Sequence, residues 1–298
     1  MTNGDSGAPT LENHAGQDDG RGRRRRALRA PLLGMAAALS LCAAARGAPA
    51  EPPCRAMTFE GSGFTVCRYD PARQELRLAA RGPAGPLASL AGLRAALGAD
   101  AGRVAFAMNA GMYDPARDPV GLFVGQGRTL TPLNLATGEG NFFLKPNGVF
   151  WTDPAGAAHV DESEDFAARA PDAVWATQSG PLLVRDGVLH GAIAANGTSL
   201  TVRDAVGVNG GGGAVFVISD GPVSFGRLAR FLRDRLGCPD ALYLDGHVSS
   251  LWAPSMGRLD RREDLGTFVV VLRQDTGPTP APPRCRPGRR CSRRPGSH

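Results

Sequence analysis

The stretch Ala241-Leu242-Tyr243-Leu244-Asp245-Gly246-His247-Val248-Ser249-Ser250 joins a short apolar run to a polar loop. Its first four residues have the length and apolar content of a buried strand. The Asp-Gly pair follows where that strand should end. Glycine lets a backbone turn sharply or approach a ligand closely, and polar residues held by a rigid scaffold often carry function. The stretch therefore predicts a β-rich core with a polar site at strand ends.

Three further motifs share this design of an amide or carboxylate beside a glycine. They are Asn109-Ala110-Gly111-Met112, Pro146-Asn147-Gly148-Val149-Phe150 and Gln178-Ser179-Gly180-Pro181. Any one of them alone is equally well explained as an ordinary glycine turn. Together with the Asp245 loop they predict one shared site.

The rest of the chain is rich in short β-like segments. We expect strands over 64–69, 74–79, 103–108, 120–124, 147–151, 182–185, 200–208, 214–219, 241–245 and 267–272. Leucine spacing predicts only two helices: one is marked by Leu87, Leu90, Leu93 and Leu97 and ends at Gly98, and the other runs from an N-cap at Ser224 to Gly237. Many strands and few helices indicate an α+β fold with a large mixed β-sheet core and a few flanking helices.

Two polar segments are interpreted as connections. Asn209 and the glycines 210–213 lie between strand-like runs with no following Lys-Ser/Thr, so they indicate a hairpin turn and not a phosphate loop. The acidic run 161–165 is expected to be a solvated loop.

The positive charge belongs to the two ends of the 298-residue chain. The net charge is +6; residues 1–50 hold seven Arg and four acids (+3), residues 275–298 hold six Arg and one Asp (+5), and 51–274 hold 21 basic and 23 acidic groups (−2). A near-neutral domain without a basic stripe argues against nucleic-acid binding.

Three regions follow from these patterns. Residues 1–50 are expected to be a signal peptide, because an Arg-rich start and a short apolar run precede Ala48-Pro49-Ala50. Sec, twin-arginine and lipoprotein routes stay open, and the apolar run is too short for a stable membrane span. Residues 51–274 are expected to form one domain in the periplasm or outside the cell, and 275–298 a disordered Pro/Arg-rich tail.

Export would allow the cysteines to oxidise. Cys54 and Cys67 flank a predicted hairpin that turns at Gly61-Ser62-Gly63, so we expect them to pair. Cys238 would remain free as a small core residue. The sequence contains no Cys-x-x-Cys pair, so we do not expect a structural zinc site.

The ordered motifs carry a family resemblance from Cys54 to about Arg273. They are Phe106–Met112, Gly140–Phe150, Gln178–Pro181, Val202-Arg203 with Val206–Val208, and Ala241–Gly246. In this order they resemble the phosphodiester glycosidase family, whose members include the enzyme that removes N-acetylglucosamine from mannose phosphate. The family usually has Asp-Gly-Gly at the last motif, whereas His247 follows Gly246 here.

The resemblance implies a hydrolase. Its reaction needs a cation to hold the phosphate, a carboxylate to stabilise an oxocarbenium-like centre and neutral groups to bind the sugar. We expect no cofactor and no metal. Arg203 is the candidate cation, and Asp245 and Asp220, each at the end of an apolar run, are the candidate carboxylates, placed at adjacent strand ends. An alternative for Arg203 is a surface ion pair with Asp204 or another acid. Candidate substrate contacts are Asn109, Gly111, Lys145, Asn147, Gln178, Ser179, Gly180, Gly246, Ser249 and Ser250. Lys145 is the only lysine, against 33 arginines.

Other functions stay open at this point. The expected substrate is a sugar phosphodiester or an envelope glycopolymer. A metal phosphodiesterase that breaks a P–O bond could use Asp114, Asp118, Asp245 and His247, and a serine hydrolase could use Ser179 or Ser249 with His247 or His190, although neither matches a known motif. A non-catalytic binder of envelope polysaccharide is a third alternative. The oligomeric state does not follow from the sequence.

Overall fold

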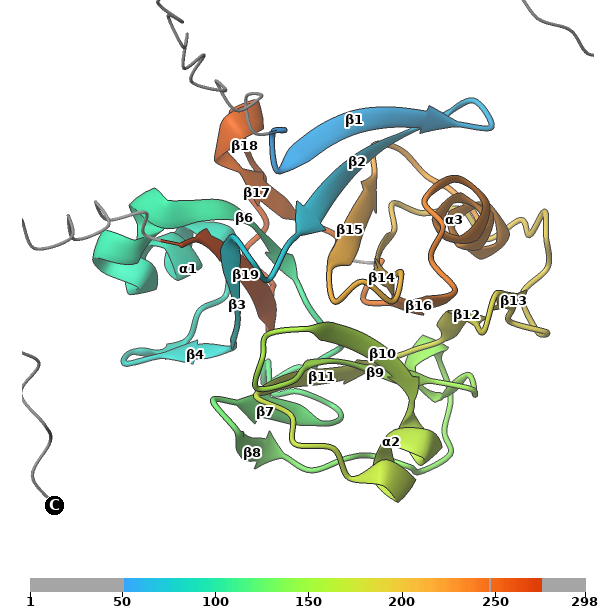
Figure 1. Cartoon of the computed structure of the whole chain (residues 1–298), viewed down its shortest axis with the longest axis horizontal. Coiled ribbons are helices and arrows are strands. Elements are labelled where there is room, and N and C mark those ends of the chain that lie inside the picture. The colour runs from blue at the N-terminus through green and yellow to red at the C-terminus, as the bar shows by residue number, and fades with distance from the viewer. Residues whose placement is uncertain (1–50, 247, 275–298) are drawn as a thin grey trace, which may run out of the picture. The chain divides into compact units, whose positions relative to one another are not determined.

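The computed structural model describes residues 51–246 and 248–274, which form three large β-sheets with short helices on their outer faces (Figure 1). The expected signal peptide, the expected C-terminal tail and His247 lie outside the described residues.

The largest sheet has seven strands, in the order β1 (Cys54–Phe59), β2 (Ser62–Tyr69), β15 (Ala214–Ser219), β14 (Asp204–Val208), β16 (Asp240–Tyr243), β12 (Leu182–Arg185) and β13 (Val188–Leu189). Its central strands are buried on both faces, which explains why their sequences are continuously apolar instead of alternating.

Two five-stranded sheets pack beside it. One has the order β10 (Ala158–Glu162), β9 (Gly148–Thr152), β11 (Trp175–Ser179), β7 (Phe123–Gly125) and β8 (Arg128–Thr131). The other has the order β18 (Arg258–Leu259), β17 (Leu251–Ala253), β6 (Val104–Asn109), β19 (Phe268–Arg273) and β3 (Gln74–Ala79). A small hairpin pairs β4 (Arg81–Gly82) with β5 (Gly85–Pro86).

Each α-helix covers the outer face of one sheet. They are α1 (Leu90–Leu97), α2 (Ser163–Arg169) and α3 (Phe225–Arg230), the last continuing into a π-helical turn over Phe231–Arg235. Short 3-10 helices span Gly98–Arg103, Asn141–Phe143 and Pro254–Met256. No helix within residues 51–246 and 248–274 is both long enough and apolar enough to cross a bilayer.

Local sequence signals set the ends of the two predicted helices. The Ser89 side chain accepts a hydrogen bond from the Gly92 N–H at the start of α1, and Gly98 (φ 54°) ends that helix. The Ser224 side chain caps α3 in the same way, and Gly237 (φ 69°) follows the π-helical turn. These caps satisfy N–H groups that a helix start leaves without partners.

The three sheets share one core, marked by one phenylalanine from each. Phe216 of β15 lies 5.4 Å from Phe106 of β6 and 5.4 Å from Phe150 of β9, measured between ring centroids. All three rings are buried. Because apolar burial is the main force that assembles such layers, this cluster fixes the sheets against one another and brings their strand ends together.

The expected α+β class is confirmed, but the strands are divided differently from the expectation. They form separate sheets in place of one large mixed sheet, and every pairing recorded among the described strands is antiparallel. Parallel pairs need a crossover connection of a dozen or more residues, and hairpins and loops join most strands here.

Three local expectations need correction. The acidic run 161–165 is not a loop, because β10 ends at Glu162 and α2 begins at Ser163. The first hairpin turns at Glu60-Gly61, so Ser62 already belongs to β2. The strand expected over 200–208 begins only at Asp204. The connection after Asn209 is the predicted hairpin turn between β14 and β15.

Cys54 and Cys67 form a disulfide across the register of β1 and β2, the pair expected from the sequence. Cys238 is free and fully buried, and burial raises the pKa of its thiol to about 11. Cys238 is therefore a packing residue and not a nucleophile.

Candidate active site

The ends of β6, β11 and β16 meet the beginning of β14 at one place in the fold. Tyr243 of β16 lies opposite Ala205 of β14, and Ser179 at the end of β11 donates a 2.6 Å hydrogen bond to the carbonyl oxygen of Leu244. The Asn109 and Gln178-Ser179 motifs thus converge on the loop that follows β16, which is itself the fourth motif.

Asn109 is the central support of this loop. Its Oδ1 accepts a 2.8 Å hydrogen bond from the Ser250 N–H, and its Nδ2 lies 3.4 Å from the carbonyl oxygen of Asp245. The same side chain also acts on the carboxyl group of Asp204, whose pKa it lowers. Asn109 is fully buried, so its amide fixes both sides of the loop and does not face solvent.

Asp204 is the site residue that the sequence analysis missed. It is fully buried, and its Oδ1 accepts a 2.8 Å hydrogen bond from the backbone N–H of Asp245. No described residue hydrogen-bonds its Oδ2. Burial raises the pKa of this carboxyl well above its usual value and the charge of Asp245 adds to the effect, whereas the bonds from the Asp245 N–H and Asn109 oppose it. The neutral carboxylic acid is therefore favoured.

A signal for Asp204 was present in the sequence. A carboxylate opens the run Asp204–Val208, whose other four residues are apolar or glycine. Acids are almost never fully buried unless they are paired. Its place after Arg203 suggests only a surface ion pair, and in the described part of the chain these two residues form none.

Arg203 is a buried cation held by neutral groups. Its Nε donates to the Val223 carbonyl oxygen (2.9 Å), and its Nη2 donates to the Ser199 carbonyl oxygen (3.1 Å). Its guanidinium carbon lies 3.5 Å from the centre of the Phe225 ring, a cation–π contact. Burial lowers the pKa of Arg203, and no carboxylate among the described residues neutralises it. The alternative of a surface ion pair is therefore wrong.

Tyr243 connects Arg203 to the Asp245 loop. Its hydroxyl oxygen lies 3.4 Å from Nη1 of Arg203. A Cβ placed on Gly246 would lie 2.0 Å from the same oxygen. The glycine of the Asp-Gly motif is thus required because a buried tyrosine hydroxyl occupies the space of a side chain.

Asp245 itself is half-buried at the end of this network. Its backbone N–H is held by Asp204, and its carbonyl oxygen accepts a 2.8 Å hydrogen bond from Ser249 Oγ. The charge of Asp245 contributes to the raised pKa of Tyr113 and of Tyr243, although burial is the main cause in both.

Asp220 does not form a pair with Asp245. Strands β15 and β16 are separated by β14, so their ends are not adjacent, and neighbouring strands are spaced by roughly 4.8 Å each. Asp220 Oδ1 accepts a hydrogen bond from Thr65 and lies 3.8 Å from Arg258 Nη1. The expected carboxylate pair is replaced by Asp204 and Asp245.

Gln178 and Ser179 point to opposite faces of β11, because side chains alternate along a strand. Gln178 Oε1 accepts from the N–H groups of Leu122 and Asn134, and its Nε2 donates to Asn134 and Ser163. Gln178 is thus a buried clamp beside α2, whereas Ser179 faces the loop.

The other candidates occupy two settings. Asn147 donates to the Phe142 carbonyl oxygen and packs against Gly180, beside Ser179. Gly111 lies so close to Gln178 that a Cβ would be 2.4 Å from the carbonyl oxygen of Gln178.

Lys145 contacts the Leu135 carbonyl oxygen and Glu164 of α2, and among the described residues it makes no hydrogen bond or ion pair with the Asp245 loop. Ser250 is fully buried, which leaves Ser249 as the half-exposed serine.

Within residues 51–246 and 248–274, no three His, Cys, Asp or Glu side chains are grouped so that they could hold a metal ion. Asp118, one ligand of the metal-dependent alternative, forms an ion pair with Arg81.

Comparison with known proteins identifies the family. A model of the phosphodiester glycosidase family matches residues 102–268. A protein of Escherichia coli strain K12 called YigE, itself described as uncharacterized, is 38% identical over 175 residues, which is 58% of this chain and 67% of that protein. The chain belongs to the phosphodiester glycosidase family.

A solved structure shares the fold. The catalytic domain of zebrafish N-acetylglucosamine-1-phosphodiester alpha-N-acetylglucosaminidase, auto-inhibited by its pro-peptide, superimposes with a TM-score of 0.53 at 16% identity. The match covers 74% of this chain and 81% of that one.

Proposed function

We propose that this protein hydrolyses the glycosidic C–O bond of a sugar phosphodiester, with Asp245 as the catalytic carboxylate. The observation that carries the proposal is the position of Asp245, half-buried at a strand end and held at its N–H by Asp204 and at its carbonyl oxygen by Ser249. Both bonds fix the backbone of Asp245 and so limit where its carboxylate can lie, and pre-organisation is a major source of electrostatic catalysis.

The reaction requires little acid assistance. The bond between the anomeric carbon and the phosphate oxygen breaks, its electron pair stays on the phosphate, and a water oxygen bonds to the carbon. Phosphate is a good leaving group. The reaction therefore needs mainly a group that stabilises the oxocarbenium-like centre or removes a proton from water. Asp245 is assigned this role. Asp204 is fully buried and serves to position it.

Arg203 is proposed to provide positive charge for the departing phosphate. Its charge is not neutralised by any described carboxylate, and Nη1 is directed to Tyr243, whose hydroxyl adjoins Gly246. Charge effects are strong in such a low-dielectric setting. Arg203 therefore acts from beneath the loop, through Tyr243.

Hydrolysis in oxygen-18 water tests the reaction class. We expect the label on the anomeric hydroxyl of the sugar and none in phosphate. Label in phosphate would show P–O cleavage, and binding of sugar phosphodiesters without turnover would show the non-catalytic function.

Variants test the residue assignment. Asp245→Asn keeps the shape and removes the charge, and loss of such a group lowers the rate by ~10²–10⁴. Asp186→Asn is a matched control, because its side chain is 88% exposed and the residue lies in the turn between β12 and β13. Equal rates in the two variants would refute the role of Asp245 and leave the reaction class standing.

We further propose that the protein is exported and acts in the periplasm or outside the cell. The Arg-rich start with a small-residue site at 48–50 supports this proposal. The Cys54–Cys67 disulfide adds support, since disulfides persist in oxidising compartments. N-terminal sequencing of the periplasmic or secreted protein should begin near residue 51, and an intact Met1 in the cytoplasmic fraction would contradict export.

A further inference from the structure

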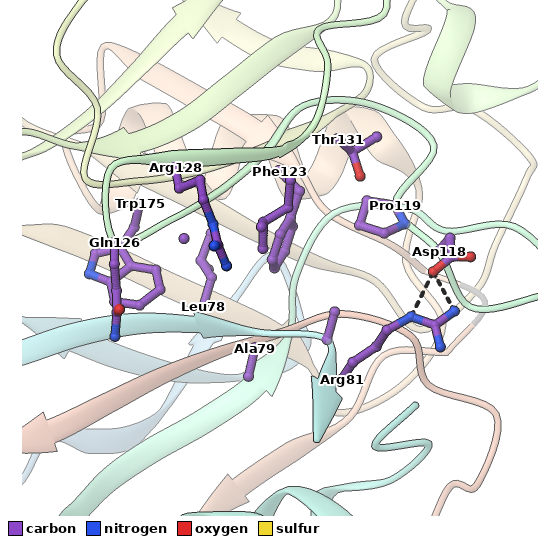
Figure 2. Close-up of a pocket in the computed structure, with 13 residues that line it drawn as sticks. Leu78, Ala79, Arg81, Asp118, Pro119, Phe123, Gln126, Arg128, Thr131 and Trp175 are labelled. Carbon is purple, nitrogen blue, oxygen red and sulfur yellow. Dashed lines mark hydrogen bonds and ion pairs between the residues drawn. The ribbon is translucent and has the colours of Figure 1, made fainter. Parts of the chain in front are cut away.

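A cavity of about 450 Å³ lies between β3–β4 and the β7–β8 hairpin (Figure 2). Ligand pockets in proteins have volumes of roughly 300–1,000 Å³. None of the residues assigned to the reaction lines it. It is therefore separate from the Asp245 site, and nothing in the proposed reaction requires it.

The floor of the cavity is apolar and contains an accessible aromatic ring. Leu78 and Phe123 are buried, and Trp175 is half-buried above them. Gly125 has no side chain that could cover the indole. A Cβ at this position would lie 3.6 Å from Trp175 Cζ3 and 3.3 Å from Leu130 Cδ1. The apolar face of a pyranose ring can pack on such a surface.

The rim of the cavity carries one uncompensated positive charge. Asp118 Oδ1 accepts two hydrogen bonds from Arg81, at 2.6 and 2.9 Å, so these two charges cancel. Arg128 is exposed, and no hydrogen bond or ion pair engages its side chain within the described chain. Two Arg and one Asp leave a net charge of +1, which belongs to Arg128.

Two neutral polar groups complete the rim. Figure 2 shows Gln126 beside Trp175 and Thr131 on the side of Pro119. Neither side chain has a recorded hydrogen-bond partner among the described residues. An amide and a hydroxyl of this kind can bind sugar hydroxyl groups.

The hairpin that carries Arg128 is fixed relative to Trp175. Its turn residues Gln126 (φ 52°) and Gly127 (φ 73°) adopt the left-handed conformation typical of two-residue hairpins. The Gly127 N–H donates a 2.8 Å hydrogen bond to the carbonyl oxygen of Val174, the residue before Trp175. The backbone positions that carry the aromatic ring and the cation are thus fixed relative to one another.

We propose that this cavity binds an anionic sugar unit of a glycopolymer, with the pyranose on Trp175 and its phosphate or other anion on Arg128. The proposal rests on the proposed function, because the bound polymer would supply the phosphodiester that is cleaved at Asp245. The cavity would then favour long polymeric substrates over small diesters. An apolar peptide would leave Arg128 without a partner, and a neutral sugar would not use its charge.

The binding test uses the mature protein and methyl N-acetyl-α-glucosaminide 6-phosphate, which contains no phosphodiester to cleave. The readout is the indole N–H signal of Trp175 in nitrogen-15 NMR spectra, assigned with Trp175→Phe. We expect a saturable shift, and at least tenfold weaker binding of the unphosphorylated methyl glycoside, because a charge-assisted hydrogen bond is lost. No shift at millimolar concentrations, or equal affinity for the neutral sugar, would overturn the proposal.

Three variants define the ligand contacts. Arg128→Gln should weaken binding of the phosphorylated sugar about tenfold or more, and Gly125→Val should do so by filling the space above Trp175. Arg94→Gln removes an exposed arginine of α1 that pairs with no residue of the described chain, and it should leave binding unchanged. Unaltered affinity in Arg128→Gln would overturn the role of the cation.

Kinetics separate this proposal from the proposed function. In Arg128→Gln, we expect an unchanged rate on a small sugar phosphodiester and a KM raised about tenfold on a long sugar-phosphate polymer. Equal KM values of wild type and variant on the polymer would overturn the polymer role. Absence of any hydrolysis by the wild type would contradict the proposed function, while the Trp175 shift would still report the binding site.

Discussion

The backbone N–H of Asp245 donates a 2.8 Å hydrogen bond to Oδ1 of Asp204, a carboxyl group without solvent exposure. The carboxyl group of Asp204 thus holds the backbone of Asp245 in place. The two acids differ in environment, because Asp204 is fully buried and Asp245 is half-buried. Burial favours the neutral acid at Asp204.

Asp204→Asn should remove a pH dependence of stability. The folded-state pKa of Asp204 is raised above the ordinary value of 3.8, so its contribution is fully present below that pH and is lost as pH rises through the folded pKa. The asparagine keeps an acceptor for the Asp245 N–H and does not ionise. Relative to wild type, the variant should gain up to about 1.4 kcal/mol of unfolding free energy per pH unit above pH ~4.

Urea denaturation of both proteins between pH 4 and 8 measures this difference. The comparison cancels other titrating groups, such as Glu60 and Asp100, whose pKa values are lowered by arginine partners. Curves that stay parallel over the range would show that Asp204 ionises in the folded protein as it does in the unfolded chain.

Gly246→Ala should destabilise the protein and disturb the site. The new Cβ would lie 2.0 Å from the hydroxyl oxygen of Tyr243, whose ring is buried. Overpacking of this kind costs typically ~1–3 kcal/mol. Gly221→Ala is the control, because a Cβ there meets no atom within 4 Å.

A double variant tests the cause of that loss. Tyr243→Phe removes the clashing oxygen, so Gly246→Ala should cost less in the Tyr243→Phe background than in the wild type. Coupling of contacting residues is typically ~0.5–3 kcal/mol. Strictly additive losses in thermal or urea denaturation would show that the hydroxyl is not the reason for the glycine.

Arg203→Lys should lower both stability and turnover. Lysine keeps the charge but cannot reach the carbonyl oxygens of Val223 and Ser199 with a planar fork. A buried acceptor left without a donor costs ~1–3 kcal/mol. Arg233→Lys is the matched control, since Arg233 pairs with Asp234 at the surface. A variant as stable and active as wild type would contradict the structural role given to the guanidinium.

Loss of the disulfide should lower the free energy of unfolding by ~2–4 kcal/mol. Cys54→Ala combined with Cys67→Ala removes a link between residues 13 apart in the sequence. Reductant should lower the stability of the wild type to that of the double variant and leave the variant unchanged. A reductant effect of equal size on both proteins would point to another cause.

Sequence patterns predicted much of the secondary structure. The runs 74–79, 182–185 and 214–219 are strands with those bounds, and the predicted cap Ser224 does cap a helix. The first predicted helix, marked from Leu87, begins only at Leu90, with Ser89 as its cap. These features depend on local periodicity and capping chemistry, which act within a few residues. Helix α2 was missed because its acidic first turn resembles a solvated loop, whereas Phe166 packs it against Val149 and Trp151 of β9.

The site was predicted in part. Its motifs identified the Asp245 loop, Asn109 and Ser179, because a glycine beside a polar residue at a strand end is visible in the sequence. The roles of Asp220 and Gln178 were not visible, because strand order and side-chain face depend on pairings between distant segments. The insertion of β14 between β15 and β16 separates Asp220 from Asp245.

The sequence by itself determined the strand-rich character, the family motifs and the cysteine pair, since each depends on residue type and short-range spacing. Only the tertiary structure decided that Asp204 lies beneath Asp245, that Gly246 adjoins Tyr243 and that Arg203 is buried among neutral groups. The physical reason is that the burial of a carboxyl or guanidinium group, and hence its charge state, depends on every chain segment packed around it. Those segments are 40 or more residues apart for Asp204 and Asp245 and meet only when the three sheets close on their shared core.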